Sequence, residues 1–211
     1  EAFPRRERKR RREEELVFLP PPIIPRGFKI IERYPLYEPY AYAVIAQHVK
    51  TGEIKYIVDE LQLMPEERAL YKKIVEYIKW DLKPPTELSE EGIREYFRRE
   101  AERIVKKYKL AAKRHETIAW DKIVYYLERD LLGYGKIDPL MRDEKIEDIS
   151  CDGVGRPVFI WHRDYESIPT NIEFTSHEEL DDFIIKLAHM AGKHISTAHP
   201  ILDAMLPGLH R

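Results

Sequence analysis

The chain has a single cysteine, Cys151, among its 211 residues. One cysteine excludes an internal disulfide bond and any zinc site built from several cysteines. We expect Cys151 to be a small, buried apolar residue, which is the commonest role of a free cysteine. The chain also lacks an apolar run near the roughly 20 residues that a membrane-spanning helix needs, and its charged amino end is unlike a signal peptide.

The signature sequences of common enzyme sites are also missing. The chain contains no G-x-x-x-x-G-K-[ST], G-x-G-x-x-G, H-E-x-x-H or G-x-S-x-G. Residues 133–136 (GYGK) have the wrong spacing for a phosphate-binding loop, and isoleucine follows the lysine. Of the eight histidines, His189 and His194 straddle Gly192, so their spacing does not guarantee a common helical face, and no Asp or Glu lies at a ligand spacing from either. We therefore expect histidines with hydrogen-bonding or surface roles, not a metal site. These absences predict that the chain is not an enzyme by itself.

The composition is that of a globular protein with a highly charged surface. Hydrophobic residues make up 43% of the chain, enough for a core, while charged residues make up 35%. Such a surface suits the ion-pair networks of thermophilic proteins. The formal net charge is only −2 and no glycine-aromatic RNA-binding motif is present, so we expect no nucleic-acid partner. Because the chain starts at Glu1 and stops abruptly at His210-Arg211, we expect it to be a piece of a longer protein.

Residues 1–27 form the first of four predicted segments, a basic tail followed by a proline-rich strap. Three prolines in LVFLPPPIIP (16–25) enforce an extended strap that we expect to lie across a groove. The tail is either a mobile charged block or an anchor for an acidic partner or anionic lipid. Its candidate partner-binding residues are Arg5, Arg6, Arg8, Lys9, Arg10, Arg11 and Arg12.

Residues 28–85 predict an α+β module. An apolar run over 41–49, turn residues at 50–53 and a return strand over 54–58 indicate a β-hairpin. Pro65 suits the first turn of a helix, where its missing N–H costs nothing. That helix buries a stripe of residues before KPPT (83–86) ends it. The predicted stripe is Leu70, Ile74, Tyr77 and Ile78.

Residues 86–132 predict a helical pair or bundle. Ser89 is a typical N-cap, and the helix after it is amphipathic with a mixed-charge outer face. Its predicted inner stripe is Ile93, Tyr96, Phe97, Ile104, Val105 and Tyr108. A second helix begins at Thr117 and ends at Gly133.

Residues 133–211 predict a small α/β lobe. Candidate strands lie at 146–151, 157–162 and 168–174, and residues 152–155 form a turn. Ser176 and Glu179 predict a capping box for the next helix, which Gly192 closes. Its expected buried stripe is Leu180, Phe183, Ile184, Leu187 and Ala191. Together the four segments predict an α+β fold.

Several stretches of this last segment carry a family resemblance. Residues 133–149 (GYGKIDPLMRDEKIEDI), 191–196 (AGKHIS) and 200–207 (PILDAMLP) resemble, in order, the amino-terminal lobe of the type II/type IV secretion ATPase family. The resemblance covers about the last 80 residues of this chain and is nearest to archaeal members, which drive protein secretion, pilus assembly or the archaellum. Arg211 is at the position of the arginine in the family's "G-S-R".

The resemblance implies a role within a larger motor. Such an ATPase is a two-lobed homohexamer, and the carboxy-terminal lobe holds ATP and magnesium. The amino-terminal lobe closes over the nucleotide and moves a membrane platform protein, which implies a cytoplasmic, peripheral location at the inner face of the membrane. Arg211 would bind the terminal phosphate with a forked, charge-assisted contact, while this chain itself would hold no cofactor. The alternative is a free-standing interaction adaptor with a basic tail.

Overall fold

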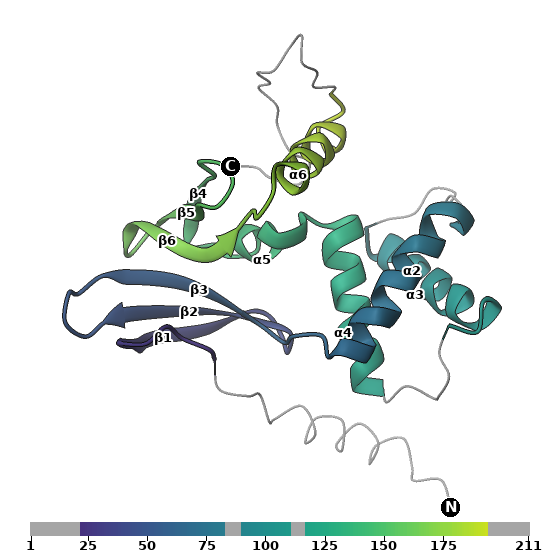
Figure 1. Ribbon diagram of the computed structural model, residues 1–211, viewed down its shortest axis with the longest axis horizontal. Helices are drawn as coiled ribbons and strands as arrows, with labels where there is room; N and C mark the ends of the chain where they lie inside the picture. The colour runs from purple at the N-terminus through teal and green to yellow at the C-terminus, as the bar shows by residue number, and fades with distance from the viewer. Residues whose placement is uncertain (1–21, 83–89, 111–116, 194–211) are drawn as a thin grey trace, which may run out of the picture.

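The protein has an α+β fold, as predicted, in which one mixed sheet is flanked by a group of helices (Figure 1). The structure, a computed structural model, describes residues 22–82, 90–110 and 117–193. The strands form a six-stranded sheet in the order β1-β2-β3-β6-β5-β4. None of the described helices is long and apolar enough to cross a bilayer.

The first half of the sheet is an antiparallel meander. It consists of β1 (Phe28–Tyr37), β2 (Ala41–His48) and β3 (Ile54–Glu60), and β2 pairs with both of the others. The predicted hairpin over 41–58 is therefore confirmed. The central residues of β2 are fully buried because both faces of this strand are covered.

Three helices stand beside the sheet, namely α2 (Pro65–Asp81), α3 (Glu90–Lys107) and α4 (Thr117–Leu127). Pro65 does open α2, and the predicted stripe is buried except at Tyr77, which is half-exposed and stacks on Tyr108. In α3, Phe97 and Ile104 face the shared core, as expected for the inner stripe. The expected cap Ser89 lies outside the described residues.

Helix α4 continues into η1 (Glu128–Leu132), a single turn of π-helix that the sequence did not predict. The Gly133 N–H closes this turn on the Glu128 carbonyl, so the expected end at Gly133 is confirmed. A short 3-10 turn η2 (Gly135–Ile137) and helix α5 (Asp138–Met141) then lead the chain back to the sheet.

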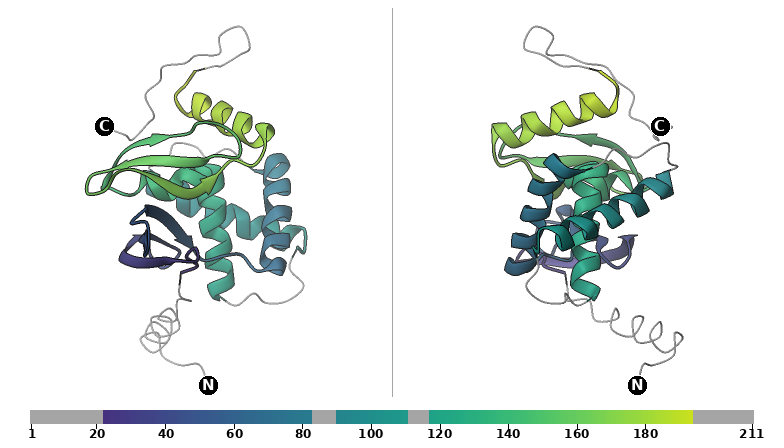
Figure 2. Two further views of the ribbon diagram at one scale, coloured as in Figure 1. Left: turned by 60° about the vertical axis from the view of Figure 1, so that its left-hand side comes forward. Right: turned by 90° about the vertical axis from the view of Figure 1, so that its right-hand side faces the viewer.

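The second half of the sheet is also antiparallel. It consists of β4 (Ile146–Ser150), β5 (Pro157–His162) and β6 (Glu166–Glu173), which agree with the three predicted strands within two residues at each end. Helix α6 (His177–Met190) lies over these strands on the side away from β1–β3 (Figure 2).

A parallel pairing of β3 with β6 joins the two halves of the sheet. Only Tyr56 and Thr170 are in register there, and the Asn171 side chain extends the pairing. Its amide oxygen accepts the Val58 N–H at 2.8 Å, and its amide nitrogen donates to the Val58 carbonyl at 3.0 Å. Strands from the predicted segments 28–85 and 133–211 therefore share one sheet and one core.

Two expectations about the last segment are wrong. Cys151 is exposed, because it follows edge strand β4 where the chain leaves the sheet. The expected stripe of α6 is only half-buried, and Ile184 keeps 37% of its surface exposed. Leu180 and Phe183 pack against the core of the sheet, and Ile184 and Leu187 border an apolar groove of about 500 Å³ between α6, α5 and β4.

The predicted capping box of α6 is half correct. The Ser176 hydroxyl accepts the Glu179 N–H at 3.2 Å, as expected for an N-cap. The Glu179 carboxylate, however, accepts the Thr175 N–H at 2.9 Å and not the Ser176 N–H. The reciprocal bond is thus shifted by one residue, and the other oxygen of the same carboxylate pairs with Lys136.

Candidate functional site

The site residues predicted from the sequence lie outside the described part of the chain. This holds for the phosphate-binding candidate Arg211 and for the basic block Arg5, Arg6, Arg8, Lys9, Arg10, Arg11 and Arg12. Their roles stay predictions. The structure instead brings together polar residues at the joint between the helices and the sheet.

Residues 133–149 begin at this joint, with a tight turn closed by Asp138. Asp138 is buried, with 4% of the residue exposed, and its carboxylate accepts the Tyr134 N–H at 3.0 Å and pairs with the Arg142 guanidinium at 2.7 Å. Gly133 leaves the space that this carboxylate fills, since a Cβ there would overlap Asp138 and lie 3.0 Å from the Arg129 carbonyl oxygen. Gly133 therefore serves packing and not phosphate binding.

Asp143, later in the same segment, is the centre of a buried hydrogen-bond network. Its Oδ2 accepts the hydroxyls of Tyr34 at 2.6 Å and Tyr56 at 2.7 Å, and its Oδ1 accepts the Lys145 N–H at 2.9 Å. Burial, followed by the Asp143 charge, raises the pKa of Tyr56 far above its ordinary value. All of these donors are satisfied, so the network anchors the start of β4 to β1 and β3.

His162 completes this network in its neutral form. Its Nδ1 accepts the Asp164 N–H at 3.1 Å, which leaves the ring proton on Nε2, 3.2 Å from the Tyr34 hydroxyl oxygen. Burial lowers the pKa of His162, although Asp143 and Asp164 oppose the shift. The imidazole therefore donates to Tyr34, which in turn donates to Asp143.

A second buried network centres on Arg129, which the π-helical turn directs toward β3. Its Nη1 binds both carboxylate oxygens of Glu60, at 2.8 and 3.0 Å, and its Nε binds Asp130 at 2.7 Å. The hydroxyl of Tyr125 donates to Glu60 at 2.5 Å, and that of Tyr71 donates to Asp130 at 2.6 Å. Burial alone would lower the pKa of Arg129, but the two carboxylates raise it, so the guanidinium stays charged.

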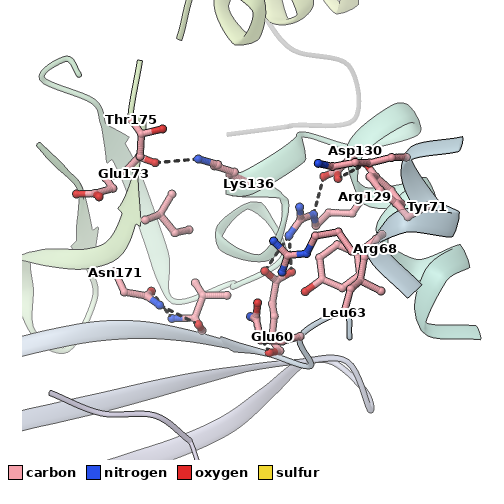
Figure 3. A pocket seen from close by; sticks show the side chains of 15 residues that line it. Glu60, Leu63, Arg68, Tyr71, Arg129, Asp130, Lys136, Asn171, Glu173 and Thr175 are labelled. Atoms are coloured by element: carbon pink, nitrogen blue, oxygen red, sulfur yellow. Dashed lines mark hydrogen bonds and ion pairs between the residues drawn. The ribbon is translucent and has the colours of Figure 1, made fainter. Parts of the chain in front are cut away.

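Beside this network lies an open cavity of about 510 Å³, which we call the joint cavity (Figure 3). Its walls come from β3 and the loop after it, α2, η1, η2 and β6. Arg68 and Lys72 of α2 line it, and their side chains make no hydrogen bond or ion pair with any residue that the structure describes. Lys136 lines the opposite side, where it pairs with Glu179 and donates to the Glu173 carbonyl at 3.1 Å.

The chemistry available at the joint cavity is that of binding. Arg68 and Lys72, whose side chains have no hydrogen bond or ion pair to a described residue, can hold an anion, whereas the partly buried carboxylates of Glu60 and Asp130 are already neutralised by Arg129. Within the described ranges, no cluster of three or more His, Cys, Asp or Glu side chains could hold a metal ion. A π-helical turn next to a cavity is also a frequent mark of a functional site.

Sequence reasoning missed this cavity almost entirely. The one local signal is the spacing of Arg68 and Lys72, four residues apart on the polar face of α2. The Arg129–Glu60 pair joins residues 69 positions apart in the chain, so no local pattern could show it.

No family model matches the chain. Among curated proteins, it is similar to three from the archaeon Methanocaldococcus jannaschii. The uncharacterized protein MJ1288 is 43% identical over 154 residues, which are 72% of this chain and 60% of that protein. The uncharacterized proteins MJ0900 and MJ0781 are 38% and 28% identical, over 41% and 74% of this chain but only 16% and 20% of their own lengths. The chain thus spans less than two thirds of each of these relatives.

Proposed function

We propose that this chain is the regulatory and docking lobe of a hexameric motor ATPase of the secretion, pilus or archaellum type. In this role it closes over ATP and magnesium held by a carboxy-terminal lobe and passes the resulting motion to a membrane platform protein. The observation that carries the proposal is the ordered series of matching stretches at 133–149, 191–196 and 200–207.

The place of the first matching stretch in the fold supports this role. A lobe that transmits motion must move as a unit, so its helices and its sheet need a stiff connection. Gly133, Asp138 and Asp143, all within that stretch, make that connection through buried contacts with neighbouring elements. In the proposed motor, these residues would keep the helices and the sheet rigidly connected.

The lengths of two of the three relatives are compatible with the proposal, whereas 60% of MJ1288 lies within the matched region. Most of MJ0900 and of MJ0781 lies outside the matched region. That leaves space for a separate nucleotide-binding lobe in proteins of this kind. In our proposal the neighbouring subunits and the platform protein are the partners, nucleic acid is not, and the lobe works at the inner face of the membrane.

The test compares ATP hydrolysis and nucleotide binding by residues 1–211 with those of the full product of the gene. We expect residues 1–211 to be inert and the full product to be active. Arg211→Ala should then slow hydrolysis on the order of a thousandfold, as for other arginines that reach a transferred phosphate. Lys73→Ala, which removes an exposed cation from α2, serves as the matched control and should change nothing. Hydrolysis by residues 1–211 alone, or an inert full product, would sink the proposal.

A second candidate is a free-standing adaptor that recruits a partner through its surface. Trp80, at the end of α2 and 86% exposed, favours it, because large exposed aromatic side chains are enriched where proteins bind one another. A full gene product that fails to bind nucleotide but still captures a platform loop, and loses it in Trp80→Ala, would favour the adaptor.

A further inference from the structure

We infer that the joint cavity binds a small phosphate-bearing molecule between Arg68 and Lys72 on one side and Lys136 on the other. This inference does not rest on the motor assignment, since the site lies wholly within the described residues. It assigns to the cavity a ligand of its own, separate from the ATP that the proposed second lobe would hold.

The charge balance of the lining favours an anion. Glu60 and Asp130 share the Arg129 guanidinium and each accepts a tyrosine hydroxyl, so neither carboxylate is free to repel a ligand. Figure 3 shows the Glu173 carboxylate directed away from the cavity, while its carbonyl oxygen binds Lys136. After these pairings, Arg68 and Lys72 are the charged side chains that face the cavity without a hydrogen bond or ion pair to any described residue.

The two free cations are placed to act together. Arg68 and Lys72 are one helical turn apart on α2, so their side chains project in the same direction. A guanidinium offers a planar fork of N–H donors and an ammonium adds a compact charge, a combination that suits the several oxygens of a phosphate. Both are exposed, so a ligand would not have to break an existing ion pair to reach them.

The size and walls of the cavity suit a phosphate ester better than a bare ion. A volume of about 510 Å³ is within the range of small-molecule sites. Tyr71, Tyr126 and Leu63 supply an aromatic and apolar wall next to the cations. Tyr126 is fixed in place by the Arg129 guanidinium 4.5 Å from its ring centre and by its own hydrogen bond to the Leu61 carbonyl.

Binding there would join parts that otherwise meet through few contacts. Arg68 and Lys72 belong to the helical layer, whereas Lys136 is fastened to β6 and to α6. A ligand held by all three would tie α2 to the second half of the sheet. The ligand should therefore raise the melting temperature of the protein, and the rise should continue with the logarithm of the free ligand concentration once that concentration exceeds Kd.

The test uses pyrophosphate, without magnesium, as the probe and nuclear magnetic resonance as the readout. Backbone amide shifts separate the cavity from the basic tail, which can also attract anions. We expect saturable shifts at 60–63, 68–72 and 136, which Arg68→Gln and Lys72→Gln each weaken about tenfold, as expected for the loss of a charge-assisted bond. The control Lys73→Gln removes an exposed cation from another face of the same helix and should bind pyrophosphate as the wild type does.

Three results would overturn the inference: no saturable shift at the cavity amides, equal weakening in all three variants, or malonate binding as tightly as pyrophosphate. Unchanged melting of the variants without ligand would show that they fold. Because ATP hydrolysis is not measured here, failure of this site and failure of the motor assignment give different results.

Discussion

Gly133 and Gly135 stand two residues apart in the same stretch, and the structure predicts very different costs when each is changed to alanine. At Gly133 a Cβ would overlap the Asp138 carboxylate and approach the Arg129 carbonyl oxygen. Overpacking of this kind costs about 1–3 kcal/mol, and displacing Asp138 also weakens its charged hydrogen bonds, worth about 1.5–3 kcal/mol each. We therefore expect Gly133→Ala to lower the free energy of unfolding by about 3 kcal/mol.

Gly135→Ala should cost less and for another reason. Gly135 has φ +59° and open space around its Cα, so alanine there meets only backbone strain, about 1–2 kcal/mol. Urea unfolding followed by circular dichroism measures both variants, with an unchanged denaturant slope as the sign that only stability moved. If Gly133→Ala and Gly135→Ala lower the free energy of unfolding equally, the predicted steric overlap at Gly133 is wrong.

A double-mutant cycle tests the proposed cause directly. With Asp138→Ala in the background, the group that Gly133→Ala displaces is gone, so the cost of Gly133→Ala should fall to about 1 kcal/mol. The difference between the two backgrounds is the coupling energy of the pair. Additive costs, within about 0.5 kcal/mol, would refute the clash with Asp138.

Three further predictions concern titration, a thiol and the seam of the sheet. Burial raises the pKa of Tyr56 and of Tyr125 well above that of an unfolded tyrosine. The free energy of unfolding should therefore be constant up to about pH 10 and then fall by about 1.4 kcal/mol per pH unit for each tyrosine, because only the unfolded chain loses the proton. Urea unfolding at about pH 9–11.5 measures this, and a free energy that stays constant over that range would contradict the burial. Exposed Cys151 should react fully with a thiol reagent under native conditions, and reaction only after denaturation would disprove its exposure. Asn171→Ala should lower the free energy of unfolding by about 2 kcal/mol, because it removes the two hydrogen bonds that the Asn171 side chain makes to the Val58 backbone between β3 and β6. A decrease under about 0.5 kcal/mol in urea unfolding would contradict that role.

Local patterns in the sequence predicted most of the secondary structure. The hairpin over 41–58, the start of α2 at Pro65 and the end of η1 at Gly133 follow from turn residues, helix-end preferences and the spacing of apolar residues. The π-helical turn was missed, because the apolar spacing of α4 runs on without a visible break.

The two wrong predictions concern burial, which depends on elements far apart in the chain that a local sequence pattern does not reveal. The stripe on α6 is amphipathic, as expected, but the pattern could not tell that the described elements leave half of it uncovered. Cys151 is apolar in character, yet its exposure depends on β4 being the edge strand, which is a property of the whole sheet.

By itself, the sequence determined the fold class and most of the strands and helices, because these depend on residues close together in the chain. Only the tertiary structure decided that β3 pairs with β6 and that Glu60 is neutralised by Arg129. The bonds that settle these points join residues 69 to 113 positions apart, such as Arg129 with Glu60 and Val58 with Asn171. Contacts at such separations arise only when the whole chain packs, so the joint cavity is a property of the fold and not of any segment.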